Sequence, residues 1–227
     1  PIGNVGLREQ SARIGYVMQD PDNQIVTDKV WHELAFGLES LGVDQKTIRL
    51  RVAEMASYFG IQSWFHKKVT ELSGGQKQLL NLASIMAMQP DVLILDEPTS
   101  QLDPIAASDF LNTVRKINRE LRTTVLITEH RLEDIFHASD LVVVMEDGKV
   151  LTADDPRQVG AFLKEKDSPI FAAMPSPVQI YYGVAGSSPN STGSFRKAYA
   201  DTCPLTVREG AAWLDTLFDG RKPKKTV

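Results

Sequence analysis

Leu72-Ser73-Gly74-Gly75-Gln76 is the stretch of sequence that decides the fold. Ser73 is a good N-cap residue, and the two glycines after it leave backbone N–H groups uncovered at the start of a helix. Such a helix N-terminus attracts a phosphate through its N–H groups and its dipole. Taken alone, Ser-Gly-Gly is more often an ordinary turn that caps a helix, so the residues around it decide between the two interpretations.

Two adjacent carboxylates end an apolar run, Val92-Leu93-Ile94-Leu95-Asp96-Glu97-Pro98. The four apolar residues predict a strand in the interior of a sheet, and Asp96 emerges at its carboxyl end, where ligands bind in open α/β sheets. Asp96 can hold Mg²⁺ there, directly or through water, and Glu97 can orient and deprotonate an attacking water. The alternative is a solvated Asp-Glu-Pro turn.

Gln19 and His130 each follow a predicted strand, over residues 14–18 and 124–128. A glutamine at the end of a strand can coordinate Mg²⁺ or a water, and a neutral imidazole can hydrogen-bond a γ-phosphate or a water. Without the other motifs Gln19 is a turn residue, and a lone histidine is more often structural.

Length and composition fit one full domain with an appendage. The 227 residues are 42% hydrophobic and carry a formal charge of -4, which argues against nucleic acid or an anionic membrane surface as the main partner. The single cysteine, Cys203, cannot form an internal disulfide, which favours a reducing compartment. We find no signal peptide and no apolar run near the ~20 residues that span a bilayer, and a start at Pro1 without Met suggests a cut or processed N-terminus.

The order of the apolar segments predicts an α/β fold with a mostly parallel sheet covered on both faces. Beyond the three strands already named, residues 141–145 predict a fourth, and Glu146-Asp147-Gly148-Lys149 predicts a hairpin turn after it. Helical spacing of apolar residues predicts a small helical insert over 28–70, with helices over 30–41 and 45–60.

Residues 156–227 are predicted to be a C-terminal extension or linker. Pro156 starts a short helix, and residues 168–194, which are rich in Pro, Ser, Gly and Asn, predict an irregular connector. A Thr206-Val207-Arg208-Glu209 capping box predicts a short helix near 207–218, and the basic tail over 221–225 is expected to be disordered.

These residues stand in the order found in the ATPase subunits of ABC transporters, and over about residues 13–155 the chain resembles that family. Gln19 matches the family's Q-loop, and Leu72–Gln76 matches its signature motif without substitution. Val92–Glu97 matches Walker B, Ser100-Gln101-Leu102-Asp103 the D-loop, and His130 the switch histidine. Residues 1–155 are therefore expected to be one ABC ATPase domain.

The resemblance implies a P-loop NTPase core that binds ATP and Mg²⁺. It implies that two ATPase domains, paired head to tail or in tandem, close over ATP and pull on a transmembrane transporter subunit at the cytoplasmic face of the membrane. The contact surface expected for that subunit lies around Asp22–Leu41. Carried over by motif, the catalytic residues are Glu97, the general base, and His130; the nucleotide-binding residues are Ser73, Gly74, Gly75, Gln76 and Asp103; and the residues for the metal ion are Asp96 and Gln19.

Four segments resemble the ATPases of energy-coupling factor (ECF) importers of vitamins and metal ions more closely. They are Gln19–Val26, Trp31–Glu39, Thr128–Glu133 and, less specifically, Cys203–Gly210, which is similar to the segment that joins two ATPase domains in tandem chains. The resemblance implies that the chain is the first domain of such a tandem protein. In these importers a separate membrane protein chooses the solute.

One motif of the family is not found in the 227 residues: the Walker A loop, G-x-x-x-x-G-K-[ST], that grips the phosphates. Gly37 and Gly42 have the glycine spacing, but Val43-Asp44 follows where Lys and Ser/Thr are required. We therefore expect a domain that lacks its N-terminal Walker A part and does not hydrolyse ATP alone. The strand that belongs before that loop is expected beside the strand over 92–96.

Two other kinds of function stay open. A DNA-repair or chromosome-structuring ABC ATPase is disfavoured, because such proteins carry long coiled-coil or zinc-bearing insertions and here only residues 20–72 separate the Q-loop glutamine from the signature serine. A non-catalytic module that caps a partner's ATP site retains the fold without the chemistry. The presence of Asp96, Glu97 and His130 argues against this second alternative.

Overall fold

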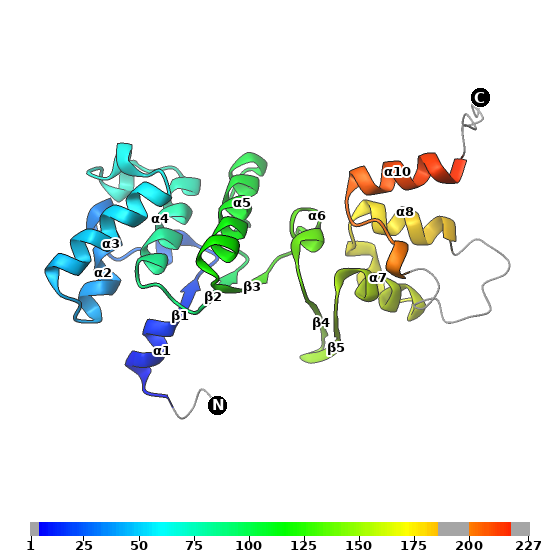
Figure 1. The fold of residues 1–227 in the computed structure, drawn as a ribbon, viewed down its shortest axis with the longest axis horizontal. Coiled ribbons are helices and arrows are strands. Elements are labelled where there is room, and N and C mark those ends of the chain that lie inside the picture. The colour runs from blue at the N-terminus through cyan, green and yellow to red at the C-terminus, as the bar shows by residue number, and fades with distance from the viewer. Residues whose placement is uncertain (1–4, 186–199, 219–227) are drawn as a thin grey trace. The chain divides into compact units, whose positions relative to one another are not determined.

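The computed structural model describes residues 5–185 and 200–218, and the chain forms two compact units, Pro1–Glu129 and His130–Val227 (Figure 1). The sequence analysis instead predicts a domain boundary after residue 155. The hairpin of residues 142–154 thus groups with the second unit, and the assignment of 1–155 to one ATPase domain stays a prediction.

The first unit is built on a parallel sheet of three strands, β1 (Ile14–Val17), β2 (Val92–Asp96) and β3 (Thr124–Thr128), in the order β1-β2-β3. Its register pairs Tyr16 with Ile94, and Ile94 with Leu126. Helices α4 (Gly74–Ala87) and α5 (Pro104–Leu121) form the crossovers, with α4 packed against β1 and α5 against β3. This confirms the predicted α/β fold with a parallel sheet.

The strand that precedes a Walker A loop was expected beside β2, and this prediction is wrong. β2 pairs with β1 on one edge and with β3 on the other, so neither edge of it is open. Among the described strands β3 pairs with β2 alone, and Leu126 at its centre is 55% exposed. The strand at this side of the sheet therefore has no partner on its outer edge among the described residues, and it exposes an apolar side chain.

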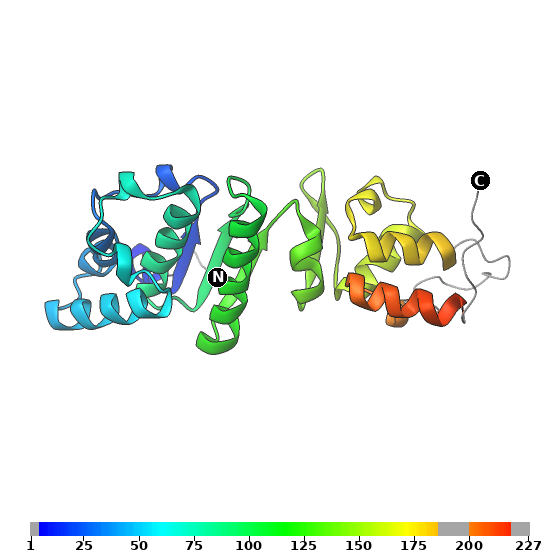
Figure 2. The same ribbon diagram turned by 90° about the horizontal axis from the view of Figure 1, so that it is seen from above.

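Two helices form within residues 28–70, and the assignment of this segment as an insert stays a prediction. α2 (Val30–Ser40) and α3 (Gln45–Tyr58) both pack against α4 (Figure 2). Two backbone bonds close the base of the insert, from Val30 N to the Lys67 carbonyl at 3.2 Å and from Val69 N to the Asp28 carbonyl at 2.9 Å. Shorter elements of this unit are α1 (Leu7–Arg13), η2 (Pro21–Asn23), η3 (Gln62–Trp64) and η4 (Val69–Glu71).

The second unit contains the predicted hairpin and a helical cluster. β4 (Val142–Glu146) and β5 (Lys149–Asp154) pair antiparallel, and Asp147 and Gly148 turn the chain with positive φ values of 49° and 73°. The other elements are α6 (Leu132–Ile135), η5 (Phe136–Ala138), α7 (Pro156–Glu165), η6 (Pro169–Ala173), α8 (Ser176–Ala185), η7 (Ala200–Thr202) and α10 (Val207–Phe218).

The irregular connector predicted over 168–194 is wrong for its first part, which forms η6 and α8. Tyr181 and Tyr182 on α8 are buried in a core that also contains Phe136, Leu163 and Cys203. Burial of these large side chains outweighs the turn-forming composition of the segment. The rest of the predicted connector and the basic tail lie outside the described residues.

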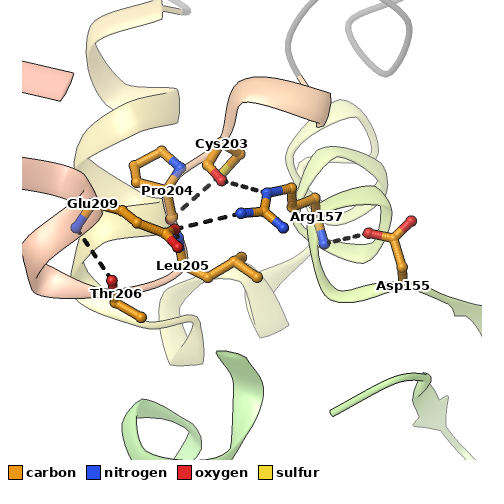
Figure 3. A network of polar contacts seen from close by, with 7 residues as sticks. All are labelled: Asp155, Arg157, Cys203, Pro204, Leu205, Thr206 and Glu209. Atoms are coloured by element: carbon orange, nitrogen blue, oxygen red, sulfur yellow. Dashed lines mark hydrogen bonds and ion pairs between the residues drawn. The ribbon is translucent and has the colours of Figure 1, made fainter. Parts of the chain in front are cut away.

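The segment before α10 is held to α7 by a polar network (Figure 3). Arg157 donates from Nε to the Cys203 carbonyl at 2.9 Å and forms an ion pair with Glu209 at 3.4 Å. Glu209 N donates to Thr206 Oγ1 at 3.2 Å, but the Glu209 carboxylate accepts from Leu205 N at 2.8 Å. The predicted capping box is thus half formed, because the glutamate binds one residue earlier and also faces an arginine.

Candidate functional site

The two carboxylates lie at the carboxyl end of β2, each with specific donors around it. Asp96 accepts from the Tyr16 hydroxyl at 2.9 Å and from Thr128 Oγ1 at 2.9 Å, so the neighbouring strands β1 and β3 both hold it. The hydrogen bond to this carboxylate raises the pKa of Tyr16 above its ordinary value, because ionisation of the phenol would remove the donor.

Glu97 follows Asp96 in a left-handed backbone conformation, with φ of 43°. This conformation is uncommon for a residue with a β-carbon and costs energy unless the surroundings impose it. Here the Glu97 N–H donates to both the carbonyl and the hydroxyl oxygen of Thr128, at 3.1 Å each. The turn thereby directs the Glu97 side chain to Gln19, whose Nε2 donates to Glu97 Oε2 at 3.1 Å.

The structure therefore brings together three of the predicted site residues, Gln19, Asp96 and Glu97, from strand ends far apart in sequence. Parallel strands make this possible, since their carboxyl ends meet at one edge of the sheet. Tyr16 and Thr128 complete the cluster, and motif reasoning missed both as site residues. The only sequence signal for them is that each lies in or at the end of a strand that carries another site residue.

The signature turn begins α4 as predicted. Gln76 N donates to Ser73 Oγ at 3.3 Å, and Ser73 N donates to Gln76 Oε1 at 3.0 Å, so the two residues form a capping box. Gly74 and Gly75 are the first two residues of the helix, whose amides have no acceptor within the helix. Ser73 and Gly74 are exposed, which leaves this helix end accessible to an anion.

Two predicted residues have roles in local structure, and a third lies at the start of the second unit. The Gln76 amide is used in the capping box, and the Asp103 carboxylate caps α5 by accepting from Ile105 N and Ala106 N at 3.0 Å each. His130 is the exposed first residue of the second unit. The nucleotide-binding roles of Gln76 and Asp103 and the catalytic role of His130 stay predictions.

The loop that carries Gln19 is fastened by side chains. Gln24 donates to the Tyr16 carbonyl and accepts from Met18 N, both at 2.8 Å, and so continues the strand pattern with its side-chain amide. Lys77, next to the signature motif, forms an ion pair with Asp22 at 2.6 Å. These contacts fix the loop to the helix that begins at the signature turn.

The turn after Glu97 is fastened to the end of β3. Thr99 is 1% exposed, and its hydroxyl donates to Glu129 Oε1 at 2.6 Å while its N–H donates to the same oxygen at 3.1 Å. A carboxylate that accepts two hydrogen bonds from one residue, one of them short, holds that residue firmly. The position of Glu97 is therefore constrained from both sides of the turn.

The donor set at this edge fits a magnesium ion bound with a nucleotide. Mg²⁺ prefers carboxylate and amide oxygens, keeps several waters, and takes its other ligands from phosphates. Asp96 supplies a carboxylate and Gln19 an amide oxygen. Both Asp96 oxygens already accept a hydrogen bond, which favours contact with the metal through water. Within residues 5–185 and 200–218, no group of three or more Asp, Glu, His or Cys side chains is arranged so that it could hold a metal ion.

No helix in the described part of the chain combines the length and apolarity needed to cross a membrane.

Comparison with known proteins agrees with the motifs. Residues 3–100 match the family model described as ABC transporter. A Bacillus cereus protein with the provisional name of ABC transporter ATP-binding protein is 47% identical over 164 residues, which are 72% of this chain and 30% of that protein. The energy-coupling factor transporter ATP-binding protein EcfA1 of Caldanaerobacter subterraneus is 42% identical over 145 residues, which are 64% of this chain and 52% of that protein.

A solved structure is similar as well. CbiO1 of Clostridium perfringens is described as part of the ABC transporter complex cbiONQ. Its structure superposes with a TM-score of 0.63 at 35% sequence identity, over 67% of this chain and 61% of the CbiO1 chain. The chain thus spans only part of the length of each of these relatives, from 30% to 61%. By sequence and by its α/β fold, the chain is similar to part of the ATP-binding proteins of ABC transporters.

Proposed function

We propose that the chain supplies the water-activating residue and the signature turn of an ATP-hydrolysing subunit in an ECF-type importer. The observation that carries this proposal is the Gln19–Glu97 pair, 3.1 Å apart, beside Asp96 at the carboxyl end of parallel strands. This is the place where ligands bind in sheets of this type. The resemblance to EcfA1 and CbiO1 supports the ECF assignment.

In the proposed reaction, Glu97 accepts a proton from a water while the water oxygen attacks the γ-phosphorus of ATP. The bond between that phosphorus and the β,γ-bridging oxygen breaks, and ADP and inorganic phosphate are released. Gln19 holds the Glu97 carboxylate and orients the water. His130 donates a hydrogen bond to the γ-phosphate oxygens. When Mg²⁺ is bound, it neutralises phosphate charge, and Asp96 and Gln19 hold it with its waters.

The phosphate-gripping loop is supplied, in this proposal, by a protein segment outside the 227 residues. The open edge of β3 is our candidate for the strand that carries it. The backbone of that edge has no partner strand among the described residues, and Leu126 offers apolar surface that an added strand would cover. A tandem or head-to-tail second ATPase domain is proposed as the partner of the signature turn.

The exposed helix start at Ser73 and Gly74 supports that arrangement. Amides at this position contact the γ-phosphate of a nucleotide bound by the opposing domain, which makes one chain's signature turn part of another domain's site. The same observation favours the second candidate function, a non-catalytic module that only caps a partner's ATP. The two differ in whether Glu97 is needed for turnover.

The membrane-embedded partner is proposed to contact the surface around Asp22–Leu41. Val26 is 65% exposed and Phe36 is 40% exposed in this region, so each offers apolar contact area. The Gln19 loop is fixed to α4 through Lys77, so closure over ATP at the signature turn moves this surface with it. The proposed location is the cytoplasmic face of the cell membrane.

The test is Glu97→Gln in the complete natural polypeptide that contains these residues, purified with its partners. Removing the proposed base should lower ATP turnover by about 10²- to 10⁴-fold and leave ATP binding intact, so that the closed dimer accumulates on gel filtration. Glu54→Gln, an exposed residue on α3, is the matched control and should turn over normally. Normal turnover in Glu97→Gln would remove Glu97 as the base and favour the capping module.

A further inference from the structure

Gln78 lies on α4, just beyond the signature motif, and its side chain is fully buried, with 0% exposure. Its Nε2 donates to the Met18 carbonyl at 3.1 Å and to the Pro98 carbonyl at 3.1 Å. Met18 directly precedes Gln19, and Pro98 directly follows Glu97. One buried amide thus joins the two backbones next to the Gln19–Glu97 pair.

The chemistry requires a donor at this position. Two carbonyl oxygens converge on the end of the side chain, and a primary amide nitrogen carries two hydrogens, one for each. If the amide were turned over, its oxygen would face both carbonyl oxygens and would donate to neither, whereas in the observed orientation only the Gln78 Oε1 of these three acceptors is without a hydrogen bond. The side chain is therefore held in one orientation by the groups it joins.

The other side-chain contacts at this site hold the Gln19 loop and the Glu97 turn separately. Gln19 is exposed, and its side chain reaches Glu97 from a loop that is 78 positions away in sequence. Thr128 and Thr99 fix the Glu97 turn to β3, and Gln24 fixes the Gln19 loop to β1. Gln78 is the side chain that binds both segments at once. Loss of its two bonds should let the two segments shift independently.

We propose that Gln78 is a positioning residue that sets the distance between Gln19 and Glu97 for water activation. This rests on the proposed function, because the geometry it sets matters only if Glu97 activates a water. A misplacement near 1 Å in such a geometry lowers turnover by about 10²-fold. The simpler alternative is that Gln78 is a buried polar residue that contributes to folding alone.

The experiment compares Gln78→Met with Thr123→Val. Methionine is close in shape to glutamine and donates no hydrogen bond. Thr123 is 3% exposed and donates to the Pro90 carbonyl at 3.4 Å, so its valine variant also loses a buried bond to a carbonyl, but at the amino ends of the strands. We would measure kcat and KM for ATP in the complete natural polypeptide with its partners, together with thermal unfolding.

We expect Gln78→Met to lower kcat by tenfold or more with KM for ATP unchanged, because the Gln78 side chain is fully buried and its amide binds two backbone carbonyls. Thr123→Val should keep its kcat even where its unfolding temperature falls as far. Equal kcat in the two variants would overturn the positioning role and leave the folding role.

A second measurement separates this proposal from the proposed function. In the 227-residue chain, the side-chain amide signals of Gln19 report its bond to Glu97 by NMR. We expect them to change in Gln78→Met and to stay in place in Thr123→Val. If the natural protein shows no ATP turnover, the proposed function fails, and these signals alone decide whether Gln78 positions the pair. Unchanged Gln19 signals in a folded Gln78→Met chain would overturn the proposal.

Discussion

The Gly74→Ala substitution separates the stability of the signature turn from its function. An added β-carbon at Gly74 meets no atom within 4 Å, and the residue does not have a positive φ. Alanine should therefore fit without strain and should stabilise the chain by about 0.4–1 kcal/mol, because it restricts the unfolded state. At Gly75 the added carbon would lie 3.2 Å from Ala106 Cβ, so Gly75→Ala should gain less or lose stability.

ATP turnover of Gly74→Ala should fall although its stability rises. The new methyl group of Gly74→Ala would stand at the exposed helix start, where the proposed phosphate must approach the amides. Loss of one such donor contact typically lowers turnover by about 10²- to 10³-fold. Stability is measured by urea unfolding of the chain, and turnover by ATP hydrolysis in the complete natural polypeptide with its partners.

Gly183→Ala is the matched control for this prediction. Gly183 is also helical, and an added β-carbon there meets nothing within 4 Å, but it lies on α8. It should raise stability similarly and leave turnover unchanged. Full ATP turnover in Gly74→Ala, together with the expected gain in stability, would refute the claim that this helix start receives a phosphate.

Two further predictions concern the stability of the chain. Thr99→Val removes the 2.6 Å bond from a buried hydroxyl to the Glu129 carboxylate and should lower the free energy of unfolding by about 1.5 kcal/mol in urea titration; an unchanged midpoint would contradict the role given to that bond. Burial raises the pKa of the Cys203 thiol to about 12, above the ordinary value of 9.0. The thiol therefore stays protonated to a higher pH in the folded state than in the unfolded state. The stabilising contribution of the neutral thiol should be complete below about pH 9 and should be lost as pH rises toward about 12, by at most about 1.4 kcal/mol per pH unit. Cys203→Ala should show a flatter decline over this range than the natural chain, and parallel curves for the two would exclude this effect.

Features encoded locally were predictable from the sequence. The Ser73 cap, the Asp96-Glu97 pair after an apolar run and the Asp147-Gly148 turn each depend on a few consecutive residues, and the structure forms all three. Their roles in binding and catalysis were carried by motif resemblance. The chemistry of the residues supports these roles.

Features that depend on distant partners were not predictable. The order β1-β2-β3 joins segments across nearly the whole first unit, and the strand pattern of each segment says nothing about its neighbours. From the sequence, Gln78 is an ordinary helix residue and Tyr16 an ordinary strand residue. Their roles depend on partners that only the structure shows, at residues 18 and 98 for Gln78 and at residue 96 for Tyr16. In the second unit, α8 forms because tyrosines are buried in a core that a local composition count does not detect.

The measurement that tests the central claim most directly is ATP hydrolysis by the purified 227-residue chain alone, with magnesium. The claim is that these residues contain the water-activating pair and the signature turn, while the loop that grips the phosphates comes from another segment. It predicts no turnover above background for the chain alone, and turnover in the complete natural polypeptide. Steady ATP hydrolysis by the chain alone, abolished by Glu97→Gln, would contradict it.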